Sequence, residues 1–515
     1  MALPWLITRT AFLSLFAFIP LLFVSDYFAN NRNRFSLLKY AFIIYSGLSI
    51  WTLCSVWWLV NSTFLGLLIA LFFYPLCMTV PFVLSQIVRQ KSGAFSGYFS
   101  LIVFWISIEW LTLNFDFAWP WLVLGNAFAR LPIIVQWYEY TGVLGGSLWI
   151  LFVNVLTFQL IHELIGKKDN QKSIQRILFI IALGLIVIPV SYSVYRYKTY
   201  KEKGVQSEWV IVQPNINSYT EKFSGMSSEL QVSKMLKLAD SLVNMRTSVV
   251  VLPETAIPQS IFEEDLESNN AIKQLRSFID KYPGVIILCG AIIQMKYNST
   301  CDGLQNFYSV KGKQGNYVQY NTALCISKNK IQIYRKSKLL PGVETMPFAK
   351  YIPSINKLLF NFGGQGGSFG TQTERTVFTM NKIHMSAIVC YEAEFGAYIG
   401  EFTRNGAQVI ALMTNDGWWG NTPGYKQHLS FSRLRAIELR RDIPRSANTG
   451  ISCVVNQRGD VLHQTVYGVA DAKKVSVSAN SQCTFYAQHV DYIGLQCLWL
   501  SFLFLFGLFL KKWYV

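Results

Sequence analysis

Charged residues are scarce in this sequence: they make up 15% of its 515 residues, whereas hydrophobic residues make up 52%. A soluble enzyme of this length carries more charge, and a purely membrane-embedded protein carries less. A mixed architecture is therefore expected, with a membrane part and a water-exposed part. The chain is also longer than one hydrophobic core usually covers, which predicts two or more structural units.

Cysteine pairs with metal-ligand spacing are missing as well. The nine cysteines include no C-x-x-C pair, and three of them lie in apolar segments. The sequence therefore indicates neither a zinc site nor a disulfide framework, and we expect no metal and no cofactor. Because the number of cysteines is odd, at least one must be unpaired.

The basic residues form no single patch. The chain has 46 Lys+Arg against 29 Asp+Glu, a net charge of +17, and these charges are spread along it. Nucleic-acid binding would require one basic patch with interleaved aromatic residues, so no nucleic-acid partner is expected. Dispersed positive charge suits loops at an anionic membrane surface, which predicts membrane lipid as a partner.

Long apolar runs dominate the first two hundred residues, and each can span about 30 Å of hydrocarbon as a helix. Counting a last run near the end of the chain, there are seven: 5–24, 38–61, 63–88, 97–115, 134–162, 175–195 and 491–510. No small-residue cleavage site follows the first run, which is expected to be a retained anchor. These runs predict an N-terminal transmembrane helical bundle over 1–200 and a C-terminal transmembrane helix over 488–515.

Lysine and arginine gather in the loops after the first, third and fifth runs and after the last one. Such loops are expected to be cytoplasmic, which puts the segment between the sixth and last runs on the opposite side of the membrane. The basic residues from Arg196 to Lys203 speak against this orientation. Long translocated domains depend less on loop charge, so the orientation is kept as the prediction.

Residues 205–480 have a different pattern, in which short β-branched runs alternate with polar helical stretches. This pattern predicts a soluble α/β domain. One of its apolar runs ends at Cys390, in the stretch HMSAIVCYEAEF. A buried free cysteine is usually a small hydrophobe, but a strand that stops at a nucleophile-type residue resembles the arrangement that exposes a reactive side chain at a sheet edge.

A cysteine nucleophile needs a group that removes its proton, and histidine is the usual one. His384 lies six residues earlier on the same predicted strand, about 20 Å away at about 3.3 Å per residue, so it cannot reach the thiol. The other four histidines stand in no context that marks a base. A site built from a carboxylate and a lysine is therefore favoured.

Candidates for these two groups follow other predicted strands. Glu254 comes directly after the run SVVVLP, where partial desolvation would raise the pKa of its carboxyl toward that of a general base. Lys336 and Lys338 follow the run IQIYR and share one face by alternation, so spacing does not choose between them. Taken singly, such residues are more often solvated charges at the rim of a sheet.

Four motifs in order carry a resemblance to the nitrilase superfamily: LPETAIP, YRKSKLLPGVE, IVCYEAEF and MTNDGWWG. The resemblance implies an α/β nitrilase-like domain with an α-β-β-α sandwich and a catalytic set of Glu, Lys and Cys. Matched residue by residue, it implies that Glu254 is the base, Lys336 stabilises the oxyanion and Cys390 is the nucleophile.

One branch of that superfamily, the apolipoprotein N-acyltransferases, has a membrane bundle before this domain and one helix after it, and the chain resembles it over nearly its whole length. The matching supporting or substrate-binding positions are Asn321, Glu344, Tyr391, Glu392, Asn415 and Trp418. In the membrane part the matching positions are Glu109, Trp119 and Pro120. The family usually has eight spans where this chain shows seven.

This resemblance implies the N-acylation of the N-terminal S-diacylglyceryl-cysteine of apolipoproteins by a ping-pong mechanism. A phospholipid would be the acyl donor, a Cys390 thioester the intermediate and a diacylated apolipoprotein the acceptor. The family's location is the bacterial inner membrane, with the catalytic domain on the periplasmic side. Glu344 and Glu392 would hold Lys336 charged and oriented, whereas Glu394 matches nothing and is expected to face solvent.

Residues 346–370 place apolar side chains at helical spacing before a glycine-rich stretch. They are predicted to form a mobile lid that dips into lipid, with an ordinary core helix and loop as the alternative. Two other functions stay open at this point. One is a membrane-anchored amidase or nitrile hydrolase, in which water replaces the amine, and the other is a non-catalytic membrane scaffold that keeps the fold.

Overall fold

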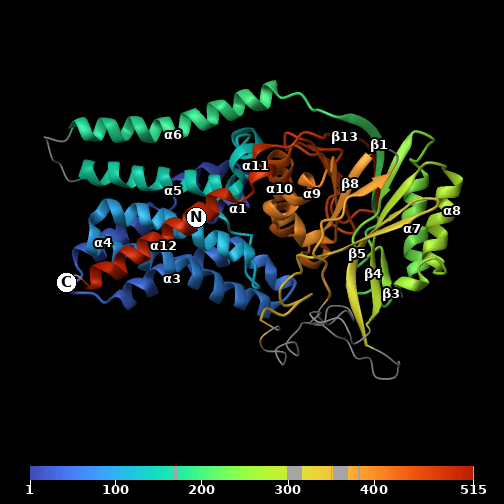
Figure 1. The fold of residues 1–515 in the computed structure, drawn as a ribbon, viewed down its shortest axis with the longest axis horizontal. Helices are drawn as coiled ribbons and strands as arrows, with labels where there is room; N and C mark the ends of the chain where they lie inside the picture. Colours follow the sequence, from blue (N-terminus) through green and yellow to red (C-terminus); the bar gives the residue numbers. More distant parts are fainter. Residues whose placement is uncertain (166–171, 298–315, 349–350, 352–368, 381–382, 514–515) are drawn as a thin grey trace. The chain divides into compact units, whose positions relative to one another are not determined.

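The computed structural model describes residues 1–165, 172–297, 316–348, 351, 369–380 and 383–513 (Figure 1). They divide into two compact units, which are described one at a time. One unit combines both ends of the chain, 1–200 and 489–515, and the other comprises 201–488. Most of the predicted lid, 349–350 and 352–368, lies outside the described residues.

The first unit is helical. Within the described part of the chain, six helical segments are long and apolar enough to cross a membrane. They are the segment of 3₁₀ helix η1 (Thr8–Leu15) with α2 (Ile19–Asn30), then α3 (Leu37–Val56), α4 (Phe64–Asn114), α5 (Tyr138–Ile165), α6 (Lys172–Thr199) and α12 (Tyr492–Trp513). The predicted run 5–24 is thus not one regular helix. After η1 a new helix, α2, begins with Pro20 in its first turn.

The 51-residue helix α4 folds back on itself. Gly93 has a φ of 87°, which favours glycine and breaks the helix. A Cβ placed on Gly97 would lie 2.5 Å from the Cβ of Arg89, although the two residues would be about 12 Å apart along a straight helix. The predicted runs 63–88 and 97–115 therefore occupy the two antiparallel arms of α4.

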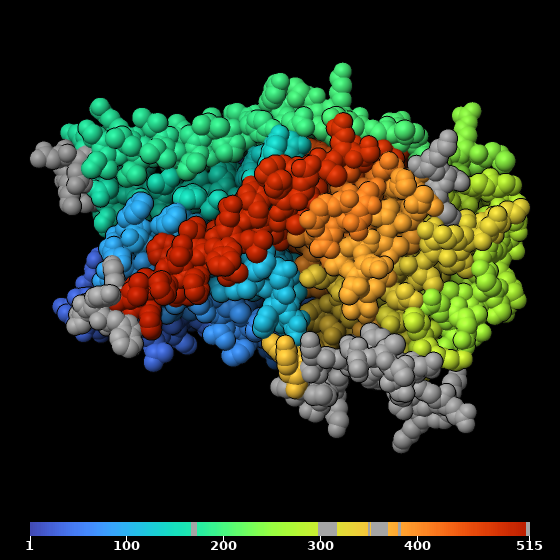
Figure 2. All heavy atoms as spheres, in the orientation of Figure 1, coloured from blue at the N-terminus to red at the C-terminus, as the bar shows by residue number. Residues whose placement is uncertain are grey.

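Helix α12 brings the end of the chain into this unit. It packs along α4, where Ser501 Oγ lies 2.8 Å from Ser107 Oγ. The close approach of Gly494 to the Trp110 ring leaves no space for a side chain, since a Cβ there would be 2.4 Å from the ring. Figure 2 shows α12 as a continuous red band over the other helices of this unit.

The second unit contains two β-sheets. One has the order β13 (Asp471–Ala479), β1 (Val205–Gln213), β2 (Thr247–Val251), β4 (Ile286–Tyr297), β5 (Asn316–Ile326) and β6 (Ile331–Arg335), with β3 (Ile257–Phe262) also paired to β4. The other has the order β12 (Val461–Leu462), β11 (Cys453–Val455), β10 (Ile443–Ala447), β9 (Val409–Thr414), β8 (Ile383–Val389) and β7 (Phe378–Met380).

Helices cover the outer faces of both sheets, which completes an α-β-β-α sandwich. Helices α7 (Ser228–Asp240) and α8 (Asn270–Lys281) cover the first sheet, and α9 (Gly396–Arg404) and α10 (Pro423–Leu439) cover the second (Figure 1). Helix α8 starts at its cap Asn269, whose side chain accepts hydrogen bonds from the first backbone amides. Its residues Ile272, Leu275 and Ile279 repeat at helical spacing and are buried.

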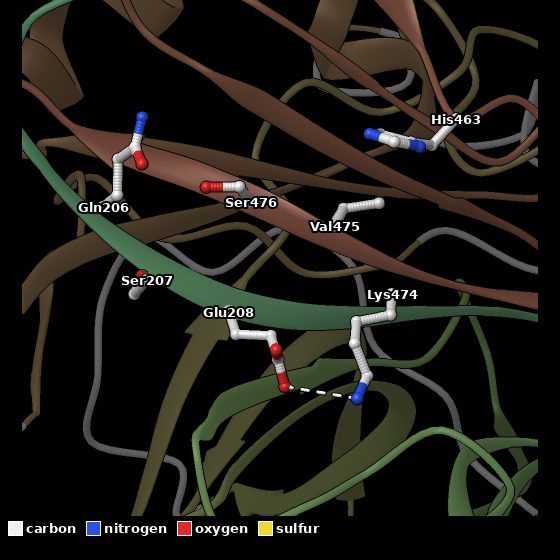
Figure 3. A pocket seen from close by; sticks show the side chains of 7 residues that line it. All are labelled: Gln206, Ser207, Glu208, His463, Lys474, Val475 and Ser476. Carbon is white, nitrogen blue, oxygen red and sulfur yellow. Dashed lines mark ion pairs between the residues drawn. The ribbon is translucent and has the colours of Figure 1, made fainter.

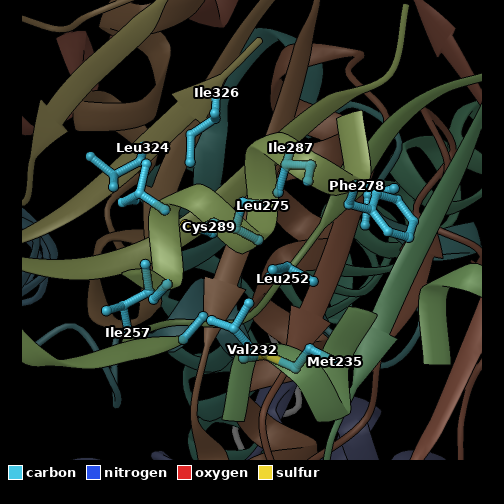
Figure 4. Close-up of a cluster of buried hydrophobic side chains, with 14 of the residues drawn as sticks. Val232, Met235, Leu252, Ile257, Leu275, Phe278, Ile287, Cys289, Leu324 and Ile326 are labelled. Atoms are coloured by element: carbon cyan, nitrogen blue, oxygen red, sulfur yellow. The ribbon is translucent and has the colours of Figure 1, made fainter. Parts of the chain in front are cut away.

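A hydrophobic core lies between the first sheet and its two helices (Figure 4). Leu275 of α8 and Met235 of α7 meet Leu252, Cys289 and Leu324 from the sheet, all fully buried. Burying a side chain of this size stabilises the fold by about 1.5–3 kcal/mol. The core therefore fixes β2, which is followed by Glu254, and β5, which carries Asn321.

Parallel strands set up the site in the second sheet. β8 pairs in parallel with β9, and β9 with β10, so their carboxyl ends meet at one edge. Every residue of β9 and β10 is buried, which explains their lack of polar alternation. Val389 pairs with Met413, so Cys390 and Thr414 are neighbours where the two strands end.

Candidate active site

The turn after β2 presents Glu254. Pro253 is followed by Glu254, which is only 7% exposed, and by Thr255 with a φ of 47°. Gly290 on β4 lets this turn approach, since a Cβ there would lie 2.4 Å from the Thr255 amide nitrogen. The close packing fixes the backbone that carries the carboxylate.

The end of β6 presents Lys336. Its amide donates to the carbonyl of Asn321 on β5 at 2.8 Å. The Asn321 side-chain amide donates to Glu254 Oε1 at 2.9 Å and to Glu344 Oε1 at 3.0 Å. Asn321 therefore holds two carboxylates at fixed positions around the lysine.

The Lys336 ammonium lies between these carboxylates. Its Nζ is 3.4 Å from Glu254 Oε1 and 2.9 Å from a carboxylate oxygen of Glu344, and the residue is 2% exposed. Burial lowers the pKa of Lys336, but the charges of Glu344 and Glu254 outweigh it and raise that pKa above its ordinary value. Lys336 is thus a permanent cation at the site.

Cys390 follows β8 and begins the 3₁₀ helix η8 (Cys390–Glu394). Its φ of 49° lies in the left-handed region, a costly conformation that is typical of functional turns. Burial raises the pKa of the Cys390 thiol well above its usual range, the charge of Glu254 raises it further, and the Lys336 ammonium opposes both. The resting thiol is therefore protonated and needs a base.

Glu392 is not a partner of the Lys336 ammonium, which corrects the expectation that it holds this lysine alongside Glu344. Its Oε1 accepts hydrogen bonds from the amide of Ser337 at 2.8 Å and from the hydroxyl of Tyr334 at 2.5 Å. Its Oε2 accepts from the amide of Val389 at 2.8 Å. Glu392 instead ties the backbone before the nucleophile to the backbone after the lysine.

Glu394 does not face solvent, contrary to the expectation. It is 4% exposed and lies 3.6 Å from His428 Nε2, and neither of its carboxyl oxygens has a hydrogen-bond partner among the described residues. Burial raises the pKa of Glu394 well above its usual range, against the opposing charges of Arg435 and Arg445. The burial of Glu394 without hydrogen-bond donors among the described residues thus favours its neutral form.

His428 on α10 was not among the predicted site residues, although it lies behind the nucleophile. Its Nδ1 is 2.9 Å from Asp416 Oδ1 and 3.1 Å from Arg445 NH2, and its Nε2 is 3.2 Å from the carbonyl oxygen of Cys390. A carbonyl can only accept, so Nε2 carries the hydrogen whichever partner Nδ1 takes. His428 therefore fixes the Cys390 peptide in its left-handed conformation.

Asp416 and Arg445 complete this second cluster. Arg445 NH2 donates to Asp416 Oδ2 at 2.7 Å, and Thr414 Oγ1 donates to Asp416 Oδ1 at 3.1 Å. Burial alone would raise the pKa of Asp416, but the charge of Arg445 and the hydrogen bond with His428 outweigh it and lower that pKa. Asp416 is adjacent to the predicted Asn415, and this adjacency was the only signal in the sequence for the cluster.

The remaining predicted residues of this unit lie in two neighbouring loops. Asn415 accepts from the amide of Gly417 at 3.3 Å and donates to Ser218 Oγ at 2.9 Å. Trp418 stacks on Phe223 with ring centroids 6.1 Å apart. Tyr391 is buried and packs edge-on against Phe395 at 5.1 Å. Asn415 and Trp418 thus join the loop after β9 to the loop after β1.

The predicted membrane-part residues belong to the helical unit and form local contacts there. Glu109 is fully buried, and its Oε1 accepts from Trp105 Nε1 at 2.9 Å and from the Leu124 amide at 2.8 Å. The carbonyl of Pro120 accepts from Asn126 Nδ2 at 3.0 Å, and the amide of Trp119 donates to the Thr112 carbonyl at 2.9 Å. These bonds fix the loop after α4.

A surface pocket elsewhere in the second unit contains none of the predicted residues (Figure 3). It lies over β1 and β13, and its residues are Gln206, Ser207, Glu208, His463, Lys474, Val475 and Ser476. Glu208 and Lys474 form an ion pair of 3.5 Å there. A partly exposed ion pair between neighbouring strands accounts for the two charged residues of this pocket.

Comparison with known proteins agrees with this architecture. Residues 211–470 match the family model of carbon-nitrogen hydrolases, and residues 1–156 match that of the apolipoprotein N-acyltransferase N-terminal domain. The chain belongs to the carbon-nitrogen hydrolase family. Its N-terminal match places it in the branch of the apolipoprotein N-acyltransferases, and it is an enzyme of the acyltransferase class.

Similar curated proteins extend over most of the chain. The apolipoprotein N-acyltransferase of Chlorobaculum tepidum is 29% identical over 462 residues, which cover 87% of this chain and 84% of that protein. The apolipoprotein N-acyltransferase 1 of Treponema denticola is 24% identical over 502 residues, which cover 94% of this chain and 89% of that protein. With its apolar helices, the chain is therefore a multi-pass bacterial membrane protein.

Among solved structures, an amidase of the nitrilase superfamily from Nesterenkonia AN1 is similar. It is 14% identical, covers 58% of this chain and 98% of that chain, and has a TM-score of 0.39.

Proposed function

We propose that the protein N-acylates apolipoproteins, with a membrane phospholipid as acyl donor and a thioester on Cys390 as intermediate. The observation that carries this proposal is the buried Lys336 ammonium, which lies 3.4 Å from Glu254 and interacts electrostatically with Cys390. The names of the curated relatives supply the acceptor class. The sequence motifs that match the nitrilase superfamily support the three roles.

The first step forms the thioester. Glu254 takes the thiol proton of Cys390, whose raised pKa makes such a base necessary, and the thiolate attacks the ester carbonyl of the phospholipid. The Lys336 ammonium stabilises the oxyanion of the tetrahedral intermediate. Collapse breaks the C–O bond, and the proton passes from Glu254 to the leaving alkoxide, which departs as lysophospholipid.

The second step uses the same three groups. The free α-amine of the S-diacylglyceryl-cysteine attacks the thioester carbonyl, and Glu254 accepts a proton from the amine. Lys336 again faces the oxyanion. Collapse breaks the C–S bond, the thiolate recovers the proton, and an amide remains on the lipoprotein. Glu344 supports both steps because it holds Lys336 charged at 2.9 Å.

Mass spectrometry of the full-length protein with phospholipid vesicles tests this proposal. We expect an acyl mass on the peptide that contains Cys390, and its loss on adding a diacylated lipopeptide with a free amine. An N-acetylated lipopeptide is the matched control and should leave the adduct in place. Discharge at equal rates with either peptide would indicate a hydrolase, and the absence of any adduct would refute the proposal.

We also propose that the protein resides in the bacterial inner membrane with residues 201–488 on the periplasmic side. The basic loops after alternate apolar runs support this orientation. Fusions of a reporter that is active only in the periplasm should be active after residue 488 and inactive after residue 515. The opposite result would reverse the orientation.

A further inference from the structure

We propose that Lys222 is a second cation of the active site, which positions Glu254 and balances the buried charge around Cys390. This inference rests on the proposed roles of Glu254 and Cys390. Lys222 lies in the loop between β1 and α7, outside the motifs that predicted the catalytic set.

The surroundings of Lys222 hold it rigidly. The residue is 1% exposed, and its Nζ donates to the backbone carbonyl of Glu254 at 2.8 Å. Its own carbonyl accepts from Gln231 Nε2 of α7 at 2.7 Å. Both ends of the residue are thus anchored, and the ammonium lies at the turn that carries the proposed base.

The charge balance of the site requires a second cation. Glu254 and Glu344 are 7% and 8% exposed, and both face the one ammonium of Lys336. One cation between two carboxylates leaves a buried excess of negative charge, and uncompensated buried charge is strongly destabilising. The Lys222 ammonium, in contact with the Glu254 backbone, supplies the missing positive charge.

Lys222 also interacts electrostatically with the nucleophile. Burial lowers the pKa of Lys222 to about 8, and the charges of Glu254 and Cys390 oppose this decrease. Such an interaction is mutual, so a charged Lys222 favours the thiolate of Cys390. The charges of Glu254 and Cys390 act on Lys222, and Glu254 in turn contacts Lys336, which also contacts Glu344.

The two lysines therefore have different tasks. Lys336 contacts both carboxylates and is the group proposed to face the oxyanion. Lys222 contacts a carbonyl oxygen and acts through Glu254 and the local field, so it is a positioning residue. Its removal should alter the reactivity of the thiol before any lipid substrate binds.

Alkylation of Cys390 by iodoacetamide tests this without a lipid substrate. The full-length protein is used in detergent, and the peptide that contains Cys390 is followed by mass spectrometry. At pH 7, Lys222→Met should lower the alkylation rate about tenfold, because the thiolate loses a nearby cation. Lys237→Met removes an exposed charge from α7 and should leave the rate unchanged.

The variant Lys222→Arg keeps its charge at high pH. At pH values above 8, where Lys222 of the wild type loses its proton, Cys390 of this variant should be alkylated faster than Cys390 of the wild type. A Lys222→Met protein that melts like wild type and alkylates at the wild-type rate would overturn the inference. If Lys222→Met does not fold, identical pH profiles of wild type and Lys222→Arg would overturn it instead.

These outcomes are independent of acyl transfer. A protein that forms no acyl adduct, yet shows the expected alkylation differences, would refute the proposed function and leave the role of Lys222 intact. Normal acyl transfer by the wild type, together with unaltered alkylation in the Lys222 variants, would support the proposed function and refute the role of Lys222.

Discussion

Two buried charge clusters flank Cys390, and they are built differently. On one side, Lys336 contacts the carboxylates of Glu254 and Glu344. On the other side, Asp416 pairs with Arg445 and His428, and His428 holds the backbone carbonyl of the nucleophile. The first cluster places ionised side-chain groups near the thiol, whereas the second fixes the peptide. The first cluster thus holds the groups proposed for the reaction, and the second positions the backbone of the nucleophile.

The largest expected effect is loss of the cation in the first cluster. Lys336→Met should reduce thioester formation about 1,000-fold, because the oxyanion loses its charged partner. The measurement is the rate at which the acyl mass appears on Cys390. Lys338→Met is the matched control, since alternation along β6 left both lysines open, and it should retain most of the rate. The reverse result would assign the oxyanion role to Lys338.

Breaking the second cluster should reduce stability more than chemistry. Asp416→Asn leaves the fully buried Arg445 guanidinium without its charged partner, which costs about 3–5 kcal/mol. A decrease in the thermal midpoint of the purified protein measures this effect. Asp460→Asn, which removes a carboxylate from the partly exposed pair with Arg458, is the comparison and should lower the midpoint far less.

A smaller effect is expected from the group that links this cluster to the nucleophile. His428→Phe removes the donor to the Cys390 carbonyl and should slow alkylation of the thiol about tenfold, equivalent to about 1.4 kcal/mol. His428→Gln keeps a side-chain N–H donor and should recover part of the rate. If both variants fold and their thiols are alkylated at the same rate as each other, the hydrogen bond to the Cys390 carbonyl has no role in reactivity.

The smallest effect concerns the buried carboxyl beside His428. The pKa of Glu394 is raised in the folded protein, so its stabilising contribution is complete below the pKa of the unfolded chain and is lost as the pH rises toward the folded value. Glu394→Gln has no such loss. The thermal midpoint of this variant minus that of the wild type should therefore increase as the pH rises from 5 to 8. The exposed Glu374→Gln should show no trend with pH. A gain that shrinks with rising pH would mean that Glu394 is ionised.

The sequence predicted the first cluster better than the second. Glu254, Lys336 and Cys390 each follow an apolar run, and motif order related them across 137 positions, so their convergence could be expected. His428 lies on α10, which is buried on almost every face. The helix therefore has no separate polar face in its sequence that would mark His428. Two of its partners, Cys390 and Asp416, follow β8 and β9, and the third, Arg445, lies within β10; the packing of the helix brings them together.

The same limit explains the two corrected glutamates. Glu392 and Glu394 both follow the nucleophile within the 3₁₀ helix η8. Their spacing in the sequence does not predict which hydrogen-bond donors lie near each carboxyl group. Glu392 finds three amide donors and two tyrosine hydroxyls, whereas Glu394 finds none in the part of the chain that the structure describes. In the helical unit, composition predicted the apolar runs, but the reversal at Gly93 depends on one backbone angle.

The packing of α12 on α4 determines the order in which the helical unit can be assembled. The ribosome makes α12 only after residues 201–488, so the face of α4 that carries Ser107 and Trp110 stays uncovered throughout the synthesis of the α/β unit. A product that stops before Tyr492 would contain the entire proposed catalytic set and still lack a helix of its membrane anchor. The packing of α4 in the helical unit is thus completed only after residues 201–488 have been made.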